Sequence, residues 1–410
     1  MPSWRAWLLL VLTVLMPATG AAQRPAAPPR TAPPPRVSEA VPGAVAAALV
    51  LQGGTLVNPG RPPIPNAVVV VRGSRVVCAA RAAACAIPRG ARAVSVKGLF
   101  VAPGLMDAHV HYSQTGWVDG RPDAVDLRAS YPYDSVVADL AAHPERFHRA
   151  WLCSGVTGVF DVGGYAWTLD LAKRTVEASD APRVRAAGPL LSTIDHWVTL
   201  PVEPQFVPMR SDSIVRASVR ALARLGSAAV KVWNIPVPDT LTPRMADLLM
   251  AAGDESRKAG MPLIVHATSL AKAREAVAAG ASVLVHNVFE DTVDQAFVES
   301  VRQRGIIVVP TLTVLEGYAD VRFGRSTAER YPLDCVDSLT RSRLEHPLPE
   351  SVRLPRPEAG ERMRRRLEEA ATISPENLRR LYAAHVAIAA GTDAGNPGTA
   401  HGPSLYRELD

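Results

Sequence analysis

Two histidines separated by one residue, His109 and His111, close an apolar run of the chain. Successive residues of a β-strand point to opposite faces, so both imidazoles lie on one face, together with Asp107. Two neighbouring imidazoles at the end of a strand form half of a site for a divalent metal ion. Such a pair also arises by chance in apolar strands, so the rest of the chain must decide.

Four further titratable residues occur at or near the ends of other apolar runs. They are Lys231, His266, His286 and Asp393. A charge within such a run is unfavourable unless it is paired or bound to a metal ion. A single strand-end histidine is more often a hydrogen-bonded core residue, but six such residues converging on one edge of a fold predict a metal centre.

Lys231 is one of only five lysines among 45 basic residues, and its neighbours are apolar. Burial lowers the pKa of an amine. A neutral amine can add carbon dioxide to form a carbamate, an anion whose two oxygens can bridge two metal ions. Arginine stays protonated and cannot react in this way. The alternative is an unmodified Lys231 paired with a carboxylate.

Short apolar runs alternate with helix-like stretches from residue 105 onward, which is typical of βα units around a parallel sheet. Eight runs predict an α/β fold of the (β/α)8 TIM-barrel type over residues 101–410, with its chemistry at the C-terminal ends of the strands. A doubly wound open sheet is the alternative, but no glycine fingerprint follows the first run. The runs are residues 105–109, 157–161, 184–188, 229–233, 263–266, 283–286, 306–310 and 386–393.

Helix-like segments lie between these runs, at residues 213–225, 242–258, 270–279 and 294–304. The long interval 311–385 includes a predicted helix at 360–372. This interval forms either a cap over the mouth of the barrel or an insertion without a role in the site.

The N-terminal residues predict an exported protein. Arg5, the apolar residues 6–16 and the small residues 20–22 are typical of a signal peptide, which we place at residues 1–22. The apolar run is shorter than the ~20 residues of a membrane span, although an uncleaved anchor is the alternative. Residues 23–45 are rich in Pro and Ala and predict an extended linker. We therefore expect a periplasmic or secreted protein without stable membrane insertion after cleavage.

Residues 46–100 predict a small β-rich module, because β-branched stretches there alternate with turn signals. Cys78 and Cys85 lie within it and either pair in an oxidising compartment or remain free thiols. Cys153 and Cys335 are expected to be structural.

The net charge of +6 does not predict a nucleic-acid partner. The basic residues are scattered, few aromatic residues accompany them, and neither a nucleic-acid motif nor a phosphate-binding loop occurs. The expected partner is a small-molecule substrate, and the sequence does not indicate an oligomeric state.

From about residue 46 to its end, the chain resembles the amidohydrolase superfamily, in particular its imidazolonepropionase-like and Xaa-Pro dipeptidase-like branch. HxH alone is a weak signal, but the motifs together are specific. They are residues 98–111, 154–161 and 230–232, His266, His286, and residues 391–395.

The resemblance implies a site with two divalent metal ions. His109, His111 and Asp393 would hold one ion, and His266 and His286 the second. Carboxylated Lys231 and a hydroxide would bridge them. Zinc suits these ligands, although other divalent ions do as well. The bridging hydroxide would attack the substrate, and Asp393 would pass its proton to the leaving amine.

Three other residues are candidates for supporting roles. Asp107 is expected to orient His109 from behind. His196 and His401 follow the third and eighth runs and are candidates for substrate contact, although each is more often a loop residue without such a role.

These features predict a metal-dependent hydrolase that cleaves a C–N amide bond, such as that of a dipeptide or N-acyl amino acid. The same ligands would serve a lactonase or phosphotriesterase. Members of the family continue beyond the eighth strand, whereas this chain ends at Asp410. The resemblance therefore implies an N-terminal β-sandwich left incomplete by an early C-terminus, and an inactive truncated fragment is the third interpretation.

Overall fold

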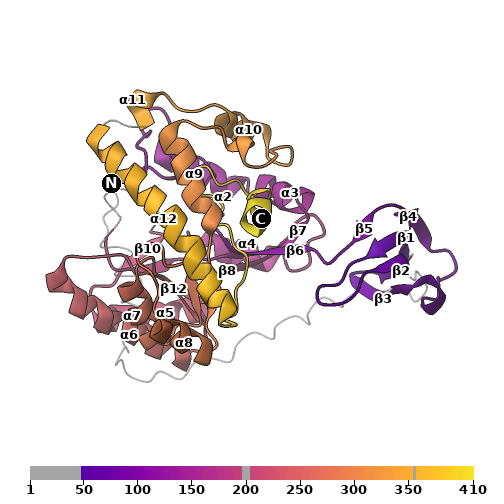
Figure 1. The fold of residues 1–410 in the computed structure, drawn as a ribbon, viewed down its shortest axis with the longest axis horizontal. Helices are drawn as coiled ribbons and strands as arrows, with labels where there is room; N and C mark the ends of the chain where they lie inside the picture. Colours follow the sequence, from indigo (N-terminus) through magenta and orange to yellow (C-terminus); the bar gives the residue numbers. More distant parts are fainter. Residues whose placement is uncertain (1–47, 196–203, 354–356) are drawn as a thin grey trace, which may run out of the picture. The chain divides into compact units, whose positions relative to one another are not determined.

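The computed structural model of the protein describes residues 48–195, 204–353 and 357–410 (Figure 1). The predicted signal peptide, the whole predicted linker at residues 23–45, and His196 lie outside these residues. The chain divides into two compact units, Met1–Ala102 and Pro103–Asp410, each with its own internal contacts.

The first unit contains one mixed β-sheet. Strand β2 forms antiparallel pairs with β1 and β3, while β4 and β5 run parallel to β1. The turn between β2 and β3 contains Gly73 at a φ of +54°, a conformation that glycine adopts without strain. A second sheet that would complete the expected sandwich is not found among the described residues. The strands are β1 (Leu49–Leu56), β2 (Ile64–Arg72), β3 (Arg75–Arg81), β4 (Arg92–Ser95) and β5 (Phe100–Val101).

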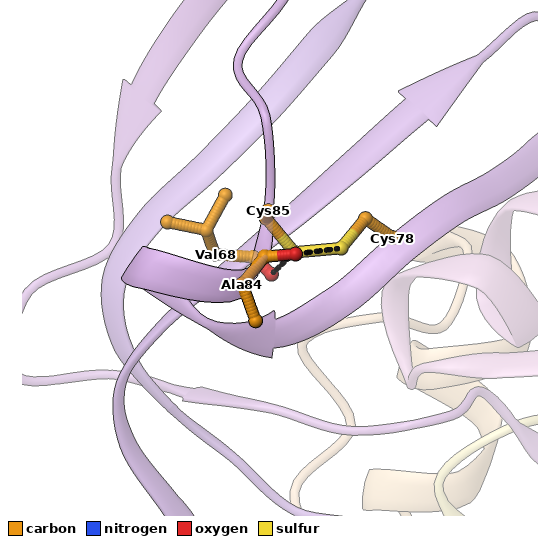
Figure 2. Close-up of a disulfide and its surroundings, with 4 residues drawn as sticks. All are labelled: Val68, Cys78, Ala84 and Cys85. Carbon is orange, nitrogen blue, oxygen red and sulfur yellow. Dashed lines mark hydrogen bonds between the residues drawn. A yellow bond between two sulfur atoms is a disulfide. The ribbon is translucent and has the colours of Figure 1, made fainter.

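Cys78 and Cys85 form a disulfide in this unit (Figure 2), which decides between the two alternatives left open by the sequence. The bond joins β3 to the end of the short 3-10 helix η1 (Ala82–Ala84). The sulfur of Cys78 lies 3.7 Å from the carbonyl oxygen of Ala84, and that of Cys85 lies 3.5 Å from the carbonyl oxygen of Val68.

The second unit is an α/β structure whose strands all pair in parallel. One sheet has the order β6-β7-β8, and another has the order β10-β9-β11-β12-β13-β14. Each of the first seven predicted apolar runs overlaps one of these strands. The strands are β6 (Leu105–Val110), β7 (Val156–Asp161), β8 (Arg183–Ala186), β9 (Leu190–Ser192), β10 (Phe206–Pro208), β11 (Val230–Trp233), β12 (Leu263–His266), β13 (Val283–Val285) and β14 (Ile307–Val309).

The eighth predicted run forms isolated bridges rather than a regular strand. On one side, the amide of Val308 donates to the carbonyl of Ala387. On the other side, the amide of Asp393 donates to the carbonyl of His109 at 2.7 Å. The segment 386–394 therefore lies between β14 and β6, the outer strands of the two sheets.

Helices follow most of the strands. The expected helices at 213–225, 242–258, 270–279 and 294–304 are confirmed, and each of these four contacts the next in chain order (Figure 1). Helix α5 begins where the Ser211 hydroxyl accepts from the amide of Ile214, and it ends at Gly226, whose φ is +82°. The four helices are α5 (Asp212–Leu225), α6 (Thr242–Lys258), α7 (Leu270–Ala278) and α8 (Gln295–Gln303).

The interval 311–385 is mostly helical. The helix expected at 360–372 is much longer, since α12 continues through Pro375, and it contacts α9. A second disulfide joins Cys153, at the end of α3, to Cys335 in this interval. None of the helices in the described ranges is both long and apolar enough to cross a membrane. The remaining helices are α2 (Tyr133–Ala142), α3 (Glu145–Cys153), α4 (Trp167–Arg174), α9 (Leu312–Phe323), α10 (Ser338–Glu345), α11 (Glu350–Arg353), α12 (Pro357–Ala383) and α13 (Ser404–Leu409), with the short 3-10 helices η2 (Val118–Gly120), η3 (Asp239–Leu241) and η4 (Thr327–Glu329).

Apolar residues of the strands pack on both faces of the sheet. A cluster containing Ile264, Val285 and Val309 packs among the strands themselves. A larger cluster packs the opposite faces of the strands against α5–α8, with Val265 and Leu249 among its members. Because both faces are largely buried, most of these strands are rich in apolar residues, although β8 has two exposed arginines, Arg183 and Arg185.

Candidate metal centre

The six residues predicted as metal ligands all line one cavity of about 160 Å³ in the second unit. They come from five segments, and most lie at the carboxyl ends of parallel strands, which meet at one edge of the fold. The structure therefore brings together side chains up to 284 positions apart in the numbering. They are His109 of β6, His111 just after β6, Lys231 of β11, His266 of β12, His286 just after β13, and Asp393 of segment 386–394.

Three of these side chains are in direct contact. The Oδ1 atom of Asp393 lies 3.2 Å from Nε2 of His109 and 2.9 Å from Nε2 of His111. The two Nε2 atoms are 3.3 Å apart. One carboxylate oxygen and two imidazole nitrogens thus face the same point, in a donor set that suits zinc and similar divalent ions.

His286 and His266 extend this cluster. The ring centroid of His286 lies 5.1 Å from that of His109 and 4.5 Å from that of His266. One ligand atom from each of His109, His286 and Asp393 lies within 4.8 Å of the others, close enough for a single ion. Both His286 and Asp393 have positive φ values, 61° and 60°. Such a backbone is strained for residues other than glycine and is typical of functional sites.

Two of the imidazoles are oriented by neighbours outside the cluster. The Nδ1 atom of His111 lies 2.7 Å from the carbonyl oxygen of Gly163. A carbonyl only accepts, so Nδ1 donates, and Nε2 is left with its lone pair directed at the cavity. The Nδ1 atom of His286 lies 2.6 Å from Oγ1 of Thr311. The Nδ1 atom of His109 is buried without a hydrogen-bond partner within the described part of the chain.

Asp107 supports the backbone rather than an imidazole ring. Its Oδ1 accepts from the amides of His109 at 3.2 Å and Thr392 at 3.0 Å. Its Oδ2 accepts from the Thr392 hydroxyl at 2.6 Å. The carboxylate therefore fastens β6 to the segment that carries Asp393, and burial raises its pKa to about 7.

Burial favours the neutral form of three of the histidines, His109, His266 and His286. It lowers the pKa values of His109 and His266 well below the usual value, and that of His286 to about 4. Although burial favours a protonated Asp393, contact with His109 and His111 holds the pKa of this carboxyl well below its usual range. Neutral imidazoles and an ionised carboxylate are the forms that bind a cation.

Lys231 is 3% exposed. Burial lowers its pKa to about 7, against a smaller opposing effect of Asp393. No carboxylate lies within ion-pair distance of its amine in the described ranges, so the alternative of a paired lysine is not supported. A buried amine without a counter-charge fits the expected modification, because a carbamate would supply the anionic oxygens that two cations need.

Several residues of the cavity were not predicted. Arg121, Tyr318 and Asn396 form a polar part of the wall. Two signals in the sequence could have found some of the missed residues. Trp233 shares the strand face of Lys231 at a spacing of two, and Asn396 follows Asp393 in a glycine-containing turn. The apolar and aromatic part of the wall includes Leu190, Phe206, Trp233, Phe289, Val314 and Leu315.

His401 is not among the residues that line the cavity. Its ring stacks on Phe147, with centroids 3.8 Å apart, and Nε2 lies 3.0 Å from the carbonyl oxygen of His111. Burial lowers its pKa to about 3. The expectation of substrate contact at His401 is thus corrected, because its side chain packs behind β6 instead of facing the site. His196, the other candidate, lies outside the described residues.

Solved structures of hydrolases have the same fold. A Xaa-Pro dipeptidase with bound methionine is 20% identical, with 88% of this chain and 82% of that chain covered and a TM-score of 0.60. A solved amidohydrolase is 18% identical, with 86% of this chain and 80% of that chain covered and a TM-score of 0.61. The ochratoxinase of A. niger is 20% identical, with 86% of this chain and 77% of that chain covered and a TM-score of 0.60. This chain has the amidohydrolase fold.

The fold expected from the sequence motifs is thereby confirmed at the level of the family's architecture. No protein-family profile and no curated protein matches the chain. At these sequence identities the likeness establishes the fold of this chain. It does not assign the substrates of the solved proteins to it.

Proposed function

We propose that this protein is a metal-dependent hydrolase that cleaves a C–N amide bond of a small molecule. The observation that carries the proposal is the convergence of four imidazoles, one carboxylate and one uncompensated buried lysine on a single cavity. Four imidazoles and one ionised carboxylate at such close range form a donor set for cations. With two cations among them they become a catalytic centre.

The proposed architecture is a (β/α)8 barrel whose eighth strand is the segment 386–394. Hydrogen bonds at both edges of the two sheets support it. The amides of Val308 and Ala108 donate to the carbonyls of Ala387 and Ala390, and the amide of Ala228 donates to the carbonyl of Ala186, just before β11. In this arrangement the six residues lie at the face where barrels of this kind carry their active sites.

The donor geometry supports a division into two metal positions. His109, His111 and Asp393 would hold one ion. His266 and His286 would hold the other. A carbamate on Lys231 would contribute to both positions. Two bound divalent ions would lower the pKa of a water molecule so that it attacks the substrate carbonyl near neutral pH. Zinc is the metal that we propose, since imidazole and carboxylate oxygen are its usual ligands here.

The chain's own residues would perform the remaining steps. Asp393 is ionised and lies at the centre of the cluster, so it accepts the proton of the attacking water and delivers it to the departing amine nitrogen. Gly163 and Thr311 keep the rings of His111 and His286 in place during this transfer. The buried position of the cluster limits the access of other water molecules.

The wall of the cavity favours a substrate with an apolar group beside its amide. Phe206 and Trp233 stack with centroids 5.0 Å apart, and Leu190, Phe289 and Leu315 also line the cavity. An apolar side chain of a dipeptide or N-acyl amino acid would pack on such a surface. The solved structures of this fold include a Xaa-Pro dipeptidase and a phenylurea hydrolase.

We also propose that the protein works in an oxidising compartment, the periplasm or the exterior of the cell. Two disulfides involve all four cysteines of the chain. Such bonds form and persist outside the reducing cytosol. This agrees with the signal peptide predicted at residues 1–22.

The test is hydrolysis by purified protein of a panel of dipeptides and N-acyl amino acids, with and without added zinc. We expect turnover of amides with an apolar side chain and about two metal ions per chain. A strong preference for lactones or phosphotriesters would mean that the protein hydrolyses those bonds and not an amide bond. Full activity in metal-free protein, or a chain that binds no metal, would contradict the proposal.

A further inference from the structure

Asn396 is a buried residue whose side chain contacts Asp393. It is 3% exposed. Its Nδ2 donates to Oδ1 of Asp393 at 2.8 Å and to the carbonyl of Asp393 at 3.1 Å. Its Oδ1 accepts from the hydroxyl of Tyr318 at 2.8 Å and from Nη1 of Arg121. Two donor positions and two acceptor positions are therefore all occupied.

The orientation of this amide is determined by its neighbours. A guanidinium donates and never accepts, so the amide oxygen must face Arg121 and the NH2 group must face Asp393. Arg121 is itself held in place by Asp123, whose carboxylate accepts from Nε and Nη2 at 2.8 and 2.7 Å. The direction of the Asn396 side chain is consequently fixed through two layers of contacts.

This fixed donor selects one oxygen of the Asp393 carboxylate. Oδ1 accepts from Asn396 and faces the two Nε2 atoms of His109 and His111, whereas Oδ2 lies 3.9 Å from Nδ1 of His286. Asn396 also holds the strained backbone of Asp393, because the backbone amide of Asn396 donates to the carbonyl of Asp393 at 3.3 Å. Without Asn396 the carboxylate could rotate and exchange its two oxygens.

Tyr318 and Arg121 also line the cavity, so they face the space where a substrate would lie. Tyr318 comes from α9 and Arg121 follows η2. These two donors contact Asn396 on one side and the cavity on the other. They therefore connect the wall of the cavity to the orientation of Asp393.

We infer that Asn396 is a positioning residue that fixes the Asp393 carboxylate, and that Tyr318 acts on catalysis through it. The inference rests on the proposed function for its effect on turnover. It assigns Oδ1 of Asp393 to the metal-facing position and leaves Oδ2 as the oxygen that takes the proton. Asn396 itself does not touch the reacting atoms.

The first variant is Asn396→Asp, which keeps an oxygen for Tyr318 and Arg121 but removes the donor to Asp393. We expect kcat to fall about 10- to 100-fold, the usual effect of removing a partner of a metal ligand, with KM changed less than about threefold. The matched control is Asn377→Asp. Asn377 is fully buried, donates to the carbonyls of Val288 and Asp291, accepts from the amide of Val293, and does not line the cavity.

The control variant is expected to lower thermal stability while leaving kcat of the folded, metal-loaded protein unchanged. If Asn396→Asp behaved like Asn377→Asp, with a loss of stability and an unchanged kcat, the positioning role would be overturned.

The second test is a double-mutant cycle with Tyr318→Phe. Alone, this change should lower kcat several-fold, because Asn396 loses one of its two orienting donors. In the Asn396→Asp background it should have no further effect, because the connection to Asp393 is already broken. An equal effect in both backgrounds would show that Tyr318 acts on the substrate directly and would overturn the link.

The third readout does not depend on turnover. Protein loaded with Co²⁺ gives a visible absorption spectrum that reports the arrangement of its ligands. We expect Asn396→Asp to alter this spectrum and Asn377→Asp to leave it unchanged, and an unaltered spectrum in Asn396→Asp would contradict the inference. If wild-type protein hydrolysed nothing yet showed this pattern, the proposed function would fail while the positioning role stood. If it bound no cobalt, both would fail.

Discussion

Two buried lysines of this chain have opposite surroundings. Lys272, in α7, is 6% exposed, and its amine lies 2.9 and 3.1 Å from the two carboxylate oxygens of Glu275, one helical turn away. Glu275 also accepts from Asn234 at 3.1 Å. Lys231, in β11, is 3% exposed and shares a cavity with four imidazoles. Burial lowers its pKa to about 7.

This difference supports our proposal that Lys272 is structural and that Lys231 is functional. The charge of Lys272 is balanced where it is buried, so its surroundings explain it completely. The amine of Lys231 has no carboxylate within ion-pair distance in the described ranges, and its surroundings are unfavourable to an ammonium group. We propose that the amine of Lys231 reacts with carbon dioxide and that the resulting carbamate binds two cations held by the neighbouring side chains.

The largest expected effect is on turnover. Lys231→Ala should lower kcat by about 10³-fold, since a bridging anion contributes several kcal/mol to charge stabilisation and each 1.4 kcal/mol is a factor of about ten. Lys272→Ala should leave kcat of the folded protein within about twofold. The measurement is steady-state kinetics with the metal content of each variant determined in parallel. Equal losses in the two variants would remove the distinction between the two lysines.

The variants of the two lysines should also differ in their response to the removal and addition of metal. A chelator should abolish activity, and added zinc should restore it in wild-type protein and in Lys272→Ala. Zinc at 100 times its dissociation constant should raise the free energy of unfolding by about 2.7 kcal/mol. Thermal melts with and without zinc would measure this, and we expect a clearly smaller shift for Lys231→Ala. A full shift in that variant would mean that Lys231 does not contribute to the metal site.

The two lysines should also differ in the sign of their contribution to the stability of metal-free protein. Lys272→Met leaves Glu275 with Asn234 as its remaining partner and should lower the free energy of unfolding by about 1–2 kcal/mol. Lys231→Met removes a buried amine without a counter-charge and should be neutral or stabilising. Urea denaturation of both variants, after dialysis against chelator, provides the comparison. A large destabilisation by Lys231→Met would indicate a structural partner for its amine.

The two lysines should also differ in the pH dependence of stability that they give metal-free protein. Burial lowers the pKa of Lys231 from 10.5 to about 7, so between these values the unfolded chain binds a proton that the folded chain does not. The free energy of unfolding should therefore rise with pH across this window, by at most about 1.4 kcal/mol per pH unit. Lys231→Met should lose this slope, whereas Lys272→Met should keep it. An identical slope in all three proteins would contradict the assignment.

Much of the fold could be predicted from the sequence because the strands are continuous apolar runs. Runs such as 263–266 and 283–286 ended at a histidine, and each contains a strand of the second unit. The expected helix 242–258 agrees with α6 at both ends. The short strands β9 and β10, with three residues each, carry too little pattern to be recognised.

A candidate site residue could be predicted where a titratable side chain interrupts an apolar strand. A contact between residues far apart in the sequence could not be predicted. Lys231 is visible as a charge inside β11. The pairing of Cys153 with Cys335, 182 residues apart, leaves no local pattern. His401 also follows the eighth run, yet its ring packs on Phe147. Sequence position gives the end of the strand but not the direction in which a loop side chain points.

The central claim is that Lys231 and Asp393 join four imidazoles around a pair of metal ions. A crystal structure of zinc-loaded protein, with anomalous data collected above and below the zinc edge, tests it most directly. We predict two anomalous peaks in the cavity, one beside His109 and His111 and one beside His266 and His286, with additional density on the amine of Lys231. A cavity without anomalous signal, or an unmodified Lys231 that contacts neither ion, would contradict the account.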